Sequence, residues 1–207
     1  MSLWPQFLRR KKIETPQQLA DFIALEADVL TQRTILNYTQ ALLGRQWKKL
    51  TETADFRAAM HRSRWESYPA ILGDFICIAE AQLRPHTEMD VPGRTAVFQR
   101  LFEAALASRP IPPEHAGDSQ AAIDRFPSEL GRRLMANPKS SDRIAVAGGI
   151  YLFDHLPIHE SARETHKLPV VNAVRFAMVA FRDNLERRIA DPAELTRQIS
   201  AGPSGAG

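Results

Sequence analysis

The sequence predicts an all-α protein, a single compact bundle of about six or seven helices, some of them kinked by proline. Three observations predict this class. The chain has 207 residues with 44% hydrophobic and 25% charged residues, as expected for one globular domain. Apolar residues return at steps of three and four in several long segments. No segment offers a convincing strand with a partner to pair with.

The first helix has the clearest start and stop signals. Thr15 can cap the helix, Pro16 occupies its first position, and Gln18 can complete a capping box. Apolar residues then recur at helical spacing as far as Gly44, a natural terminator. We therefore expect a helix over about residues 16–43.

A second helical region begins near Asp55 and runs to the residues before Pro85. Pro69 lies inside it and lacks the amide hydrogen that a continuous helix uses. The pattern is compatible with one bent helix or with two consecutive helices.

Two further helices are predicted over residues 94–108 and from Asp118 onward, the second with a kink or a fresh start at Pro127. Between them, residues 109–113 contain three prolines, which predict an extended linker.

The apolar segment 144–153 suits a buried strand or a buried helix, and we expect a helix because a lone strand cannot satisfy its backbone. The last strong helix should run from Pro169 to about Ala190. Its heptad-like seam over 171–185 favours an intramolecular core, with a homodimer as the alternative.

We divide the chain into an N-terminal segment (1–14), an all-α domain (15–198) and a disordered tail (199–207).

Charge is concentrated at the start of the chain. The net charge is +3, but Arg9, Arg10, Lys11 and Lys12 follow one another with no acid in the first twelve residues, which leaves −1 for the rest. A nearly neutral body has no broad basic face that would release counterions from a duplex, so nucleic-acid binding is not favoured. Residues 1–65 together carry +5 and favour contact with an acidic partner.

Two groups of residues are candidates for that contact. In the first, apolar side chains precede the four cations, an arrangement that could bind the interface of an anionic membrane weakly. In the second, three basic residues share one helical face at i, i+4 and i+7. The candidate residues are Trp4, Phe7, Arg9, Arg10, Lys11 and Lys12 in the first group and Arg57, His61 and Arg64 in the second.

Catalytic patterns are weak. Ser119 lies in a Gly-Asp-Ser block similar to the first block of the GDSL hydrolases, but the answering D-x-x-H block is not found and no strand precedes the serine. His155, His159 and His166 cluster in sequence, but Pro157 disfavours the unbroken helix that a zinc-protease pair needs. We therefore predict no catalytic residue, no cofactor and no metal.

Location follows from the same patterns. No apolar run reaches the roughly 18 residues needed to cross a bilayer. The apolar residues at the start precede the cations, the reverse of an export signal. Cys77 is the only cysteine, so no internal disulfide can form. We expect a cytoplasmic protein, in a peripheral membrane location if the first group binds lipid.

Three segments resemble a family of uncharacterised helical proteins from alphaproteobacteria: residues 13–23, 63–69 and 156–160. The resemblance implies a helical fold and carries neither an established activity nor functional residues.

The sequence thus leads to a non-catalytic interaction module whose basic N-terminal third contacts an acidic protein or an anionic membrane. One alternative is a small esterase-like serine hydrolase that uses Ser119 and one of the C-terminal histidines. The other is nucleic-acid binding.

Overall fold

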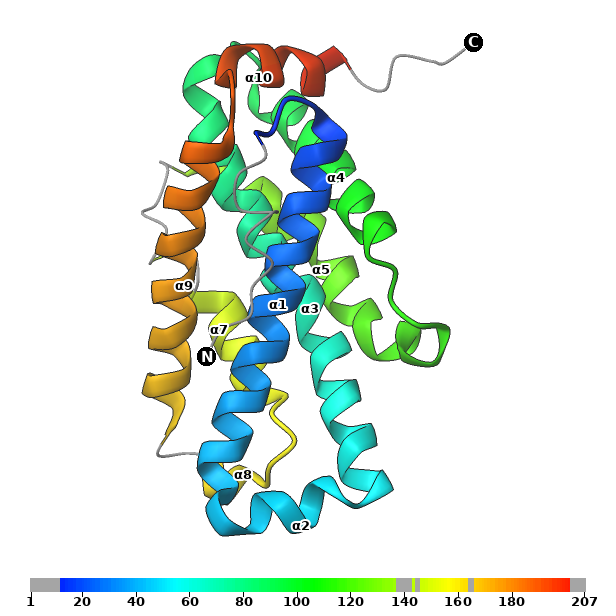
Figure 1. The fold of residues 1–207 in the computed structure, drawn as a ribbon. Helices are drawn as coiled ribbons and strands as arrows, with labels where there is room; N and C mark the ends of the chain where they lie inside the picture. Colours follow the sequence, from blue (N-terminus) through cyan, green and yellow to red (C-terminus); the bar gives the residue numbers. More distant parts are fainter. Residues whose placement is uncertain (1–11, 137–142, 144–145, 164–165, 202–207) are drawn as a thin grey trace.

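The structure is a computed structural model that describes residues 12–136, 143, 146–163 and 166–201. These residues form an elongated bundle whose long helices run along one another (Figure 1). The α-helices are α1 (Pro16–Leu43), α2 (Trp47–Thr51), α3 (Ala54–Leu83), α4 (Val91–Ser108), α5 (Ala116–Met135), α7 (Val146–Asp154), α8 (Glu160–Arg163), α9 (Lys167–Arg188) and α10 (Pro192–Ala201). Short 3-10 turns η1 (Gly44–Gln46), η2 (Arg84–His86) and η3 (Pro113–His115) join some of them.

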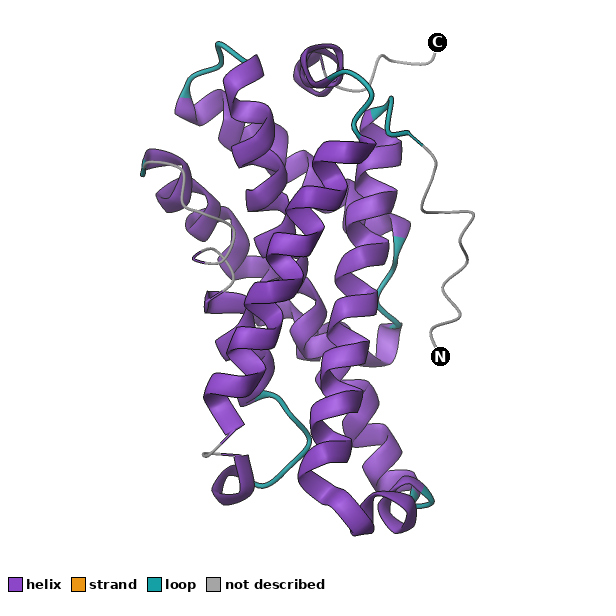
Figure 2. Ribbon diagram, turned by 60° about the vertical axis from the view of Figure 1, so that its left-hand side comes forward, coloured by secondary structure: helices purple, strands orange, loops and turns teal. Residues whose placement is uncertain are grey.

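The described residues confirm the all-α class. They contain seven helices of nine residues or more, and Figure 2 draws helices and loops but no strand among them. The single extended pairing there is an isolated parallel bridge between Ile13 and Ile189. It ties the chain just before α1 to the residue just after α9.

Helix α3 is the centre of the bundle. It packs against α1, α4, α5, α7 and α9. Every residue from Ile71 to Glu80 is buried. Pro69 lies inside α3, and the helix continues through it as a single element, so the prediction of one helix rather than two is the correct alternative.

Helix α1 has the predicted ends. The Thr15 hydroxyl accepts a hydrogen bond from the Gln18 amide (3.3 Å), and the Gln18 side-chain oxygen accepts one from the Glu14 amide (2.8 Å). The first bond is the expected cap, and the second differs from a standard capping box because Gln18 reaches the amide of Glu14 instead of the amide of Thr15. At the other end, Gly44 takes a positive φ of 49°, a conformation that glycine adopts without steric cost.

The predicted seam on α9 is core. Val171, Val174, Met178, Phe181 and Leu185 are all buried within the single chain. The Phe181 ring stacks on Phe75 with ring centroids 3.8 Å apart, and on Phe22 at 5.7 Å. These contacts join α9 to α3 and α1, as the intramolecular alternative required.

Three buried carboxylates, Asp28, Asp74 and Glu80, cross-link the helices through arginines. Asp28 of α1 accepts two hydrogen bonds from Arg64 of α3 (2.8 and 2.9 Å) and also pairs with Arg109, which follows α4. A buried carboxylate is tolerated only when its oxygens accept hydrogen bonds. The bonds to the arginines therefore fix the positions of the helices relative to one another.

The other two carboxylates follow the same rule. Asp74 accepts from Arg133 of α5 (2.7 Å) and from the Gly148 amide of α7 (2.9 Å). Burial nevertheless raises the pKa of Asp74 from 3.8 to about 6, although Arg133 and the Gly148 amide oppose the rise. Glu80 pairs with Arg84 (2.7 Å) and with Arg94 of α4 (3.2 Å).

Some predicted boundaries were wrong. Residues 199–201, assigned to a disordered tail, form the end of α10, and Ile199 is buried because α10 packs on the bundle. The linker 109–113 leads into η3, and the next helix begins at Ala116 rather than Asp118. The helix expected over 144–153 is confirmed from Val146 onward, and residues 144–145 lie outside the described part of the chain.

Candidate functional site

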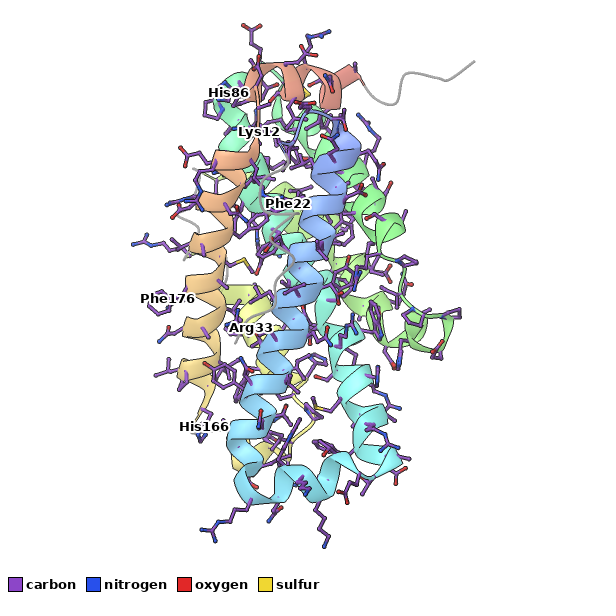
Figure 3. The ribbon with its side chains drawn as sticks, viewed as in Figure 1. Lys12, Phe22, Arg33, His86, His166 and Phe176 are labelled. Atoms are coloured by element: carbon purple, nitrogen blue, oxygen red, sulfur yellow. The ribbon has the colours of Figure 1, made fainter. Side chains whose placement is uncertain are left out.

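The first candidate group lies almost wholly outside the described residues, which begin at Lys12. Trp4, Phe7, Arg9, Arg10 and Lys11 belong to the part that is not described. The Lys12 ammonium donates a hydrogen bond to the backbone carbonyl of Arg187, at 3.0 Å. Lys12 therefore lies at the C-terminal end of α9, next to the Ile13–Ile189 bridge (Figure 3).

The second candidate group is on α3, on one helical face as predicted, but its members have different surroundings. Arg57 is exposed and donates to the carbonyls of Thr51 (3.1 Å) and Glu52 (3.0 Å) at the end of α2. His61 is exposed. Arg64 is half-buried and bonded to Asp28, so it serves the interior rather than a partner surface.

Lys12, the described residue of the first group, is far in space from the second group. Lys12 lies near the start of α1, whereas η1, α2 and the start of α3 lie beyond its other end (Figures 1 and 3). Helix α1 has 28 residues, which span about 42 Å at 1.5 Å per residue. Among the described residues, Lys12 and the basic residues of η1, α2 and the start of α3 thus do not share one surface.

The end formed by η1, α2 and the start of α3 is an exposed basic surface. Arg45, Lys48, Lys49, Arg57 and His61 are exposed there, together with the acids Glu52 and Asp55. We call the five basic residues the basic end. The two aromatic residues next to them, Trp47 and Phe56, meet edge to face, with ring centroids 6.1 Å apart. This contact holds α2 against α3.

A groove of about 520 Å³ lies between α1 and α9. Its floor is formed by Phe75 and Phe181, which are buried and stacked on one another. Val29, Leu30, Ala177 and Ala180 form its sides, and its rim carries Glu26, Arg33, Asn184 and Arg187. We call this feature the α1–α9 groove. Its apolar floor and polar rim are typical of sites that bind an apolar group.

Ser119 is placed as a structural residue. It is completely buried, and its hydroxyl donates to the backbone carbonyls of Trp65 (2.8 Å) and His115 (3.0 Å). A serine nucleophile needs a base that accepts its proton. The neighbouring imidazole of His115 instead faces Asp118 through Nδ1, at 3.2 Å. This geometry gives no support to the hydrolase alternative.

The C-terminal histidines have separate partners. Nδ1 of His155 faces the Tyr151 carbonyl at 2.7 Å, and Nδ1 of His159 faces the Ser161 hydroxyl at 2.9 Å. Among the described residues, no three histidine, cysteine or acidic side chains are arranged to hold a metal ion.

The structure brings together a polar cluster that the sequence did not suggest. Glu66 of α3 is close enough for three other charged groups to act on it: His155, directly after α7, Asp118 of α5, and His115, directly before α5. Burial is the main cause that raises the pKa of Glu66, and His155 opposes it. The Tyr151 ring stacks on His155, with centroids 4.1 Å apart.

Helical periodicity could not have found this cluster, because its members come from separate segments of the chain and the patterns that include Asp118 and His155 do not connect them with Glu66. Buried ion-pair networks raise and lower pKa values as active sites do. The raised pKa of Glu66 therefore does not define a catalytic site by itself.

No family model, no curated protein and no solved structure matches the chain. The resemblance to an alphaproteobacterial family stays a prediction. Within the described residues, no helix combines the length and the apolar character that crossing a membrane requires.

Proposed function

We propose that the protein is a non-catalytic interaction module of the cytoplasm that binds an anionic surface, peripherally at a membrane, through its N-terminal segment. The observation that carries this proposal is the order of residues at the start of the chain. Trp4, Phe7 and Leu8 precede four consecutive cations, and the first twelve residues contain no acid. The alternative partner is the acidic surface of a protein, which carries the same negative charge as an anionic membrane.

The energetics favour weak and reversible binding. Each Lys or Arg near an anionic membrane contributes about 1 kcal/mol, or roughly fivefold in affinity. Bulky apolar side chains add the burial of their surface in the interfacial layer. Neither contribution alone gives stable anchoring, so the segment is suited to a protein that joins and leaves the surface.

The polar residues of the interior support a binding role over a catalytic one. Ion pairs with arginines engage all three buried carboxylates, Asp28, Asp74 and Glu80. The Ser119 hydroxyl donates its hydrogen bonds to backbone carbonyls. The charges that remain exposed at the basic end, including Lys48 and Lys49, lie on the outside of the bundle.

The test is co-sedimentation of the full chain with vesicles of neutral lipid containing about a third of anionic lipid. We expect binding that falls as salt is raised. Replacing Arg9, Arg10 and Lys11 together with Gln should lower the affinity at least tenfold. The matched control removes the same number of cations from the basic end, by replacing Arg45, Lys48 and Lys49 with Gln, and should change the affinity much less.

Two results would reject this assignment. Equal losses in the two triple variants would mean that net charge, and not the N-terminal segment, governs binding. Absence of binding to anionic vesicles, combined with retention of an acidic protein that the first triple variant fails to retain, would replace the membrane with a protein partner.

A further inference from the structure

The α1–α9 groove has an apolar surface that is partly exposed at Val29, Leu30, Ala177 and Ala180. Its floor is the stacked pair Phe75 and Phe181, and small residues of α9, Ala177 and Ala180, leave room above it. A volume of about 520 Å³ lies within the range of about 300–1,000 Å³ that is typical of ligand pockets. It is large enough to take bulky apolar side chains.

The described chain begins at one end of this groove. The Lys12 ammonium bonds the carbonyl of Arg187, a rim residue of the groove. The Ile13 amide donates to the Arg188 carbonyl (2.8 Å), and the Ala190 amide donates to the Ile13 carbonyl (3.1 Å). These two bonds hold the backbone of Ile13 against the C-terminal end of α9.

The direction of the chain at this point also matters. The Ile13–Ile189 bridge is parallel, so the chain runs in the same direction through Ile13 and through Ile189. The chain before Ile189 is α9. Going backwards from Ile13 therefore leads along α9 from Arg187 towards Ala177. This is the direction in which the groove extends.

The lengths agree. Arg187 and Ala177 are ten residues apart on α9, or about 15 Å along the helix axis. An extended chain covers roughly 3.3 Å per residue. Leu8 and Phe7, four and five residues before Lys12, therefore reach about 13–17 Å and arrive beside Ala177. Trp4 reaches about 26 Å, which is past Ala177, the farthest α9 residue that lines the groove.

We propose that residues 7–11 of the same chain lie along the α1–α9 groove, with Phe7 and Leu8 packed beside Ala177 at its far end. The three residues Arg9, Arg10 and Lys11 then lie beside the C-terminal end of α9, where the helix dipole favours cations and where Glu186 is exposed. The cations stay at the surface while the apolar side chains are covered.

This docked state gives the proposed function a means of regulation, and that part of the inference rests on the proposed function. Phe7 and Leu8 cannot contact the groove and a membrane at once. Only the fraction of molecules with the segment released is competent to insert these side chains, and the apparent affinity falls by that fraction.

Photocross-linking of the full chain tests the docking itself. We would replace Phe7 with p-benzoylphenylalanine, which keeps an aromatic group at that position, and map the products by mass spectrometry. The expected products are cross-links within one chain to peptides that include Leu30 or Ala177. Ala177→Trp, which fills the groove, should abolish most of them.

The matched control is Phe176→Trp. Phe176 is adjacent in sequence and 77% exposed, and it points away from α1 (Figure 3). This variant should leave the cross-links unchanged. If Ala177→Trp lowers the melting temperature, Ala180→Trp tests the same groove from an exposed position.

Cross-links scattered over the surface, or equal yields in the Ala177→Trp and Phe176→Trp chains, would overturn the docking. Cross-links between two chains would assign the groove to the segment of a second copy and would also overturn it.

Vesicle binding separates the failure of the two proposals. If docking regulates binding, Ala177→Trp should raise the affinity for anionic vesicles roughly threefold or more over Phe176→Trp. Groove cross-links with equal vesicle affinity in both variants would reject the regulation. Groove cross-links without vesicle binding in any variant would reject the membrane function and leave the docking intact.

Discussion

The two parts of α3 differ sharply in their surroundings. None of residues 54–62 is buried, and none of residues 63–83 is exposed. The first part lies beside α2 at the basic end, whereas the second is surrounded by α1, α4, α5, α7 and α9. The same helix is thus a surface element and then the centre of the core. Side chains on one face of such a helix are therefore exposed to solvent in the first part and buried in the second.

This difference explains why the basic face predicted on α3 divides. Arg57 and His61 lie in the exposed part. Arg64 lies in the buried part, where it donates hydrogen bonds to Asp28. A charge in the buried part should matter for stability, and a charge in the exposed part should not. The four predictions that follow test this contrast.

The largest effect is expected for Asp28→Ala. This change removes the buried carboxylate that pairs with Arg64 and Arg109, whose side chains are 18% and 42% exposed. Breaking a buried ion pair by removing one partner costs about 3–5 kcal/mol, and the partial exposure of the two arginines places this change near the lower end, at about 3 kcal/mol. Urea unfolding should show a loss of that size in the free energy of unfolding. A loss below about 1 kcal/mol would show that the pair behaves as a surface salt bridge.

The second effect is a pH dependence that Asp74 contributes. Its pKa is raised in the folded state from 3.8 to about 6, so the folded protein binds a proton more readily than the unfolded chain does. The stability that this group contributes is therefore lost as the pH rises from about 4 to 6, by up to about 3 kcal/mol. The free energy of unfolding of the wild type minus that of Asp74→Asn should fall over this interval. A constant or rising difference would contradict the account.

A third effect is expected at Gly148, which packs on the buried part of α3. A methyl group there would collide with the Asp74 carboxylate and press on Ile71. Gly148→Ala should lower the free energy of unfolding by about 1–3 kcal/mol. Gly131→Ala is the matched control, since nothing lies within 4 Å of the added methyl group in α5, and it should stabilise by up to about 1 kcal/mol. Equal effects of the two changes would mean that helix propensity alone decides.

The smallest effect is expected in the exposed part of α3. Arg62 has a side chain that is 63% exposed, with its Nε 3.7 Å from an Asp118 oxygen. Arg62→Ala should change the free energy of unfolding by less than about 0.5 kcal/mol. A loss comparable to that of Asp28→Ala would remove the contrast between the two parts of the helix.

Local signals in the sequence predicted the elements whose ends are decided locally. The cap at Thr15 and the terminator Gly44 gave the bounds of α1, and the seam ending at Leu185 gave the core face of α9. The short helices α2 and α10 were not predicted. Each is stabilised by packing on the bundle, such as the Trp47–Phe56 contact, and this does not show in residue spacing.

The candidate site was less predictable than the fold for a related reason. Residue spacing placed Arg57, His61 and Arg64 on one face but could not say where α3 enters the core. It also could not show that the α1–α9 groove begins where Lys12 meets Arg187, since that contact joins residues 175 positions apart.

The most direct measurement is a titration of the isotopically labelled full chain with small anionic bicelles, followed by amide NMR. The account predicts shifts or broadening at residues 3–12 and at amides around the α1–α9 groove, such as Leu30 and Ala177, as the segment leaves. Amides near Ser119 and His155, which do not line the groove, should stay unchanged. Changes confined to the region of Glu66, Ser119 and His155, with none in the N-terminal segment, would contradict it.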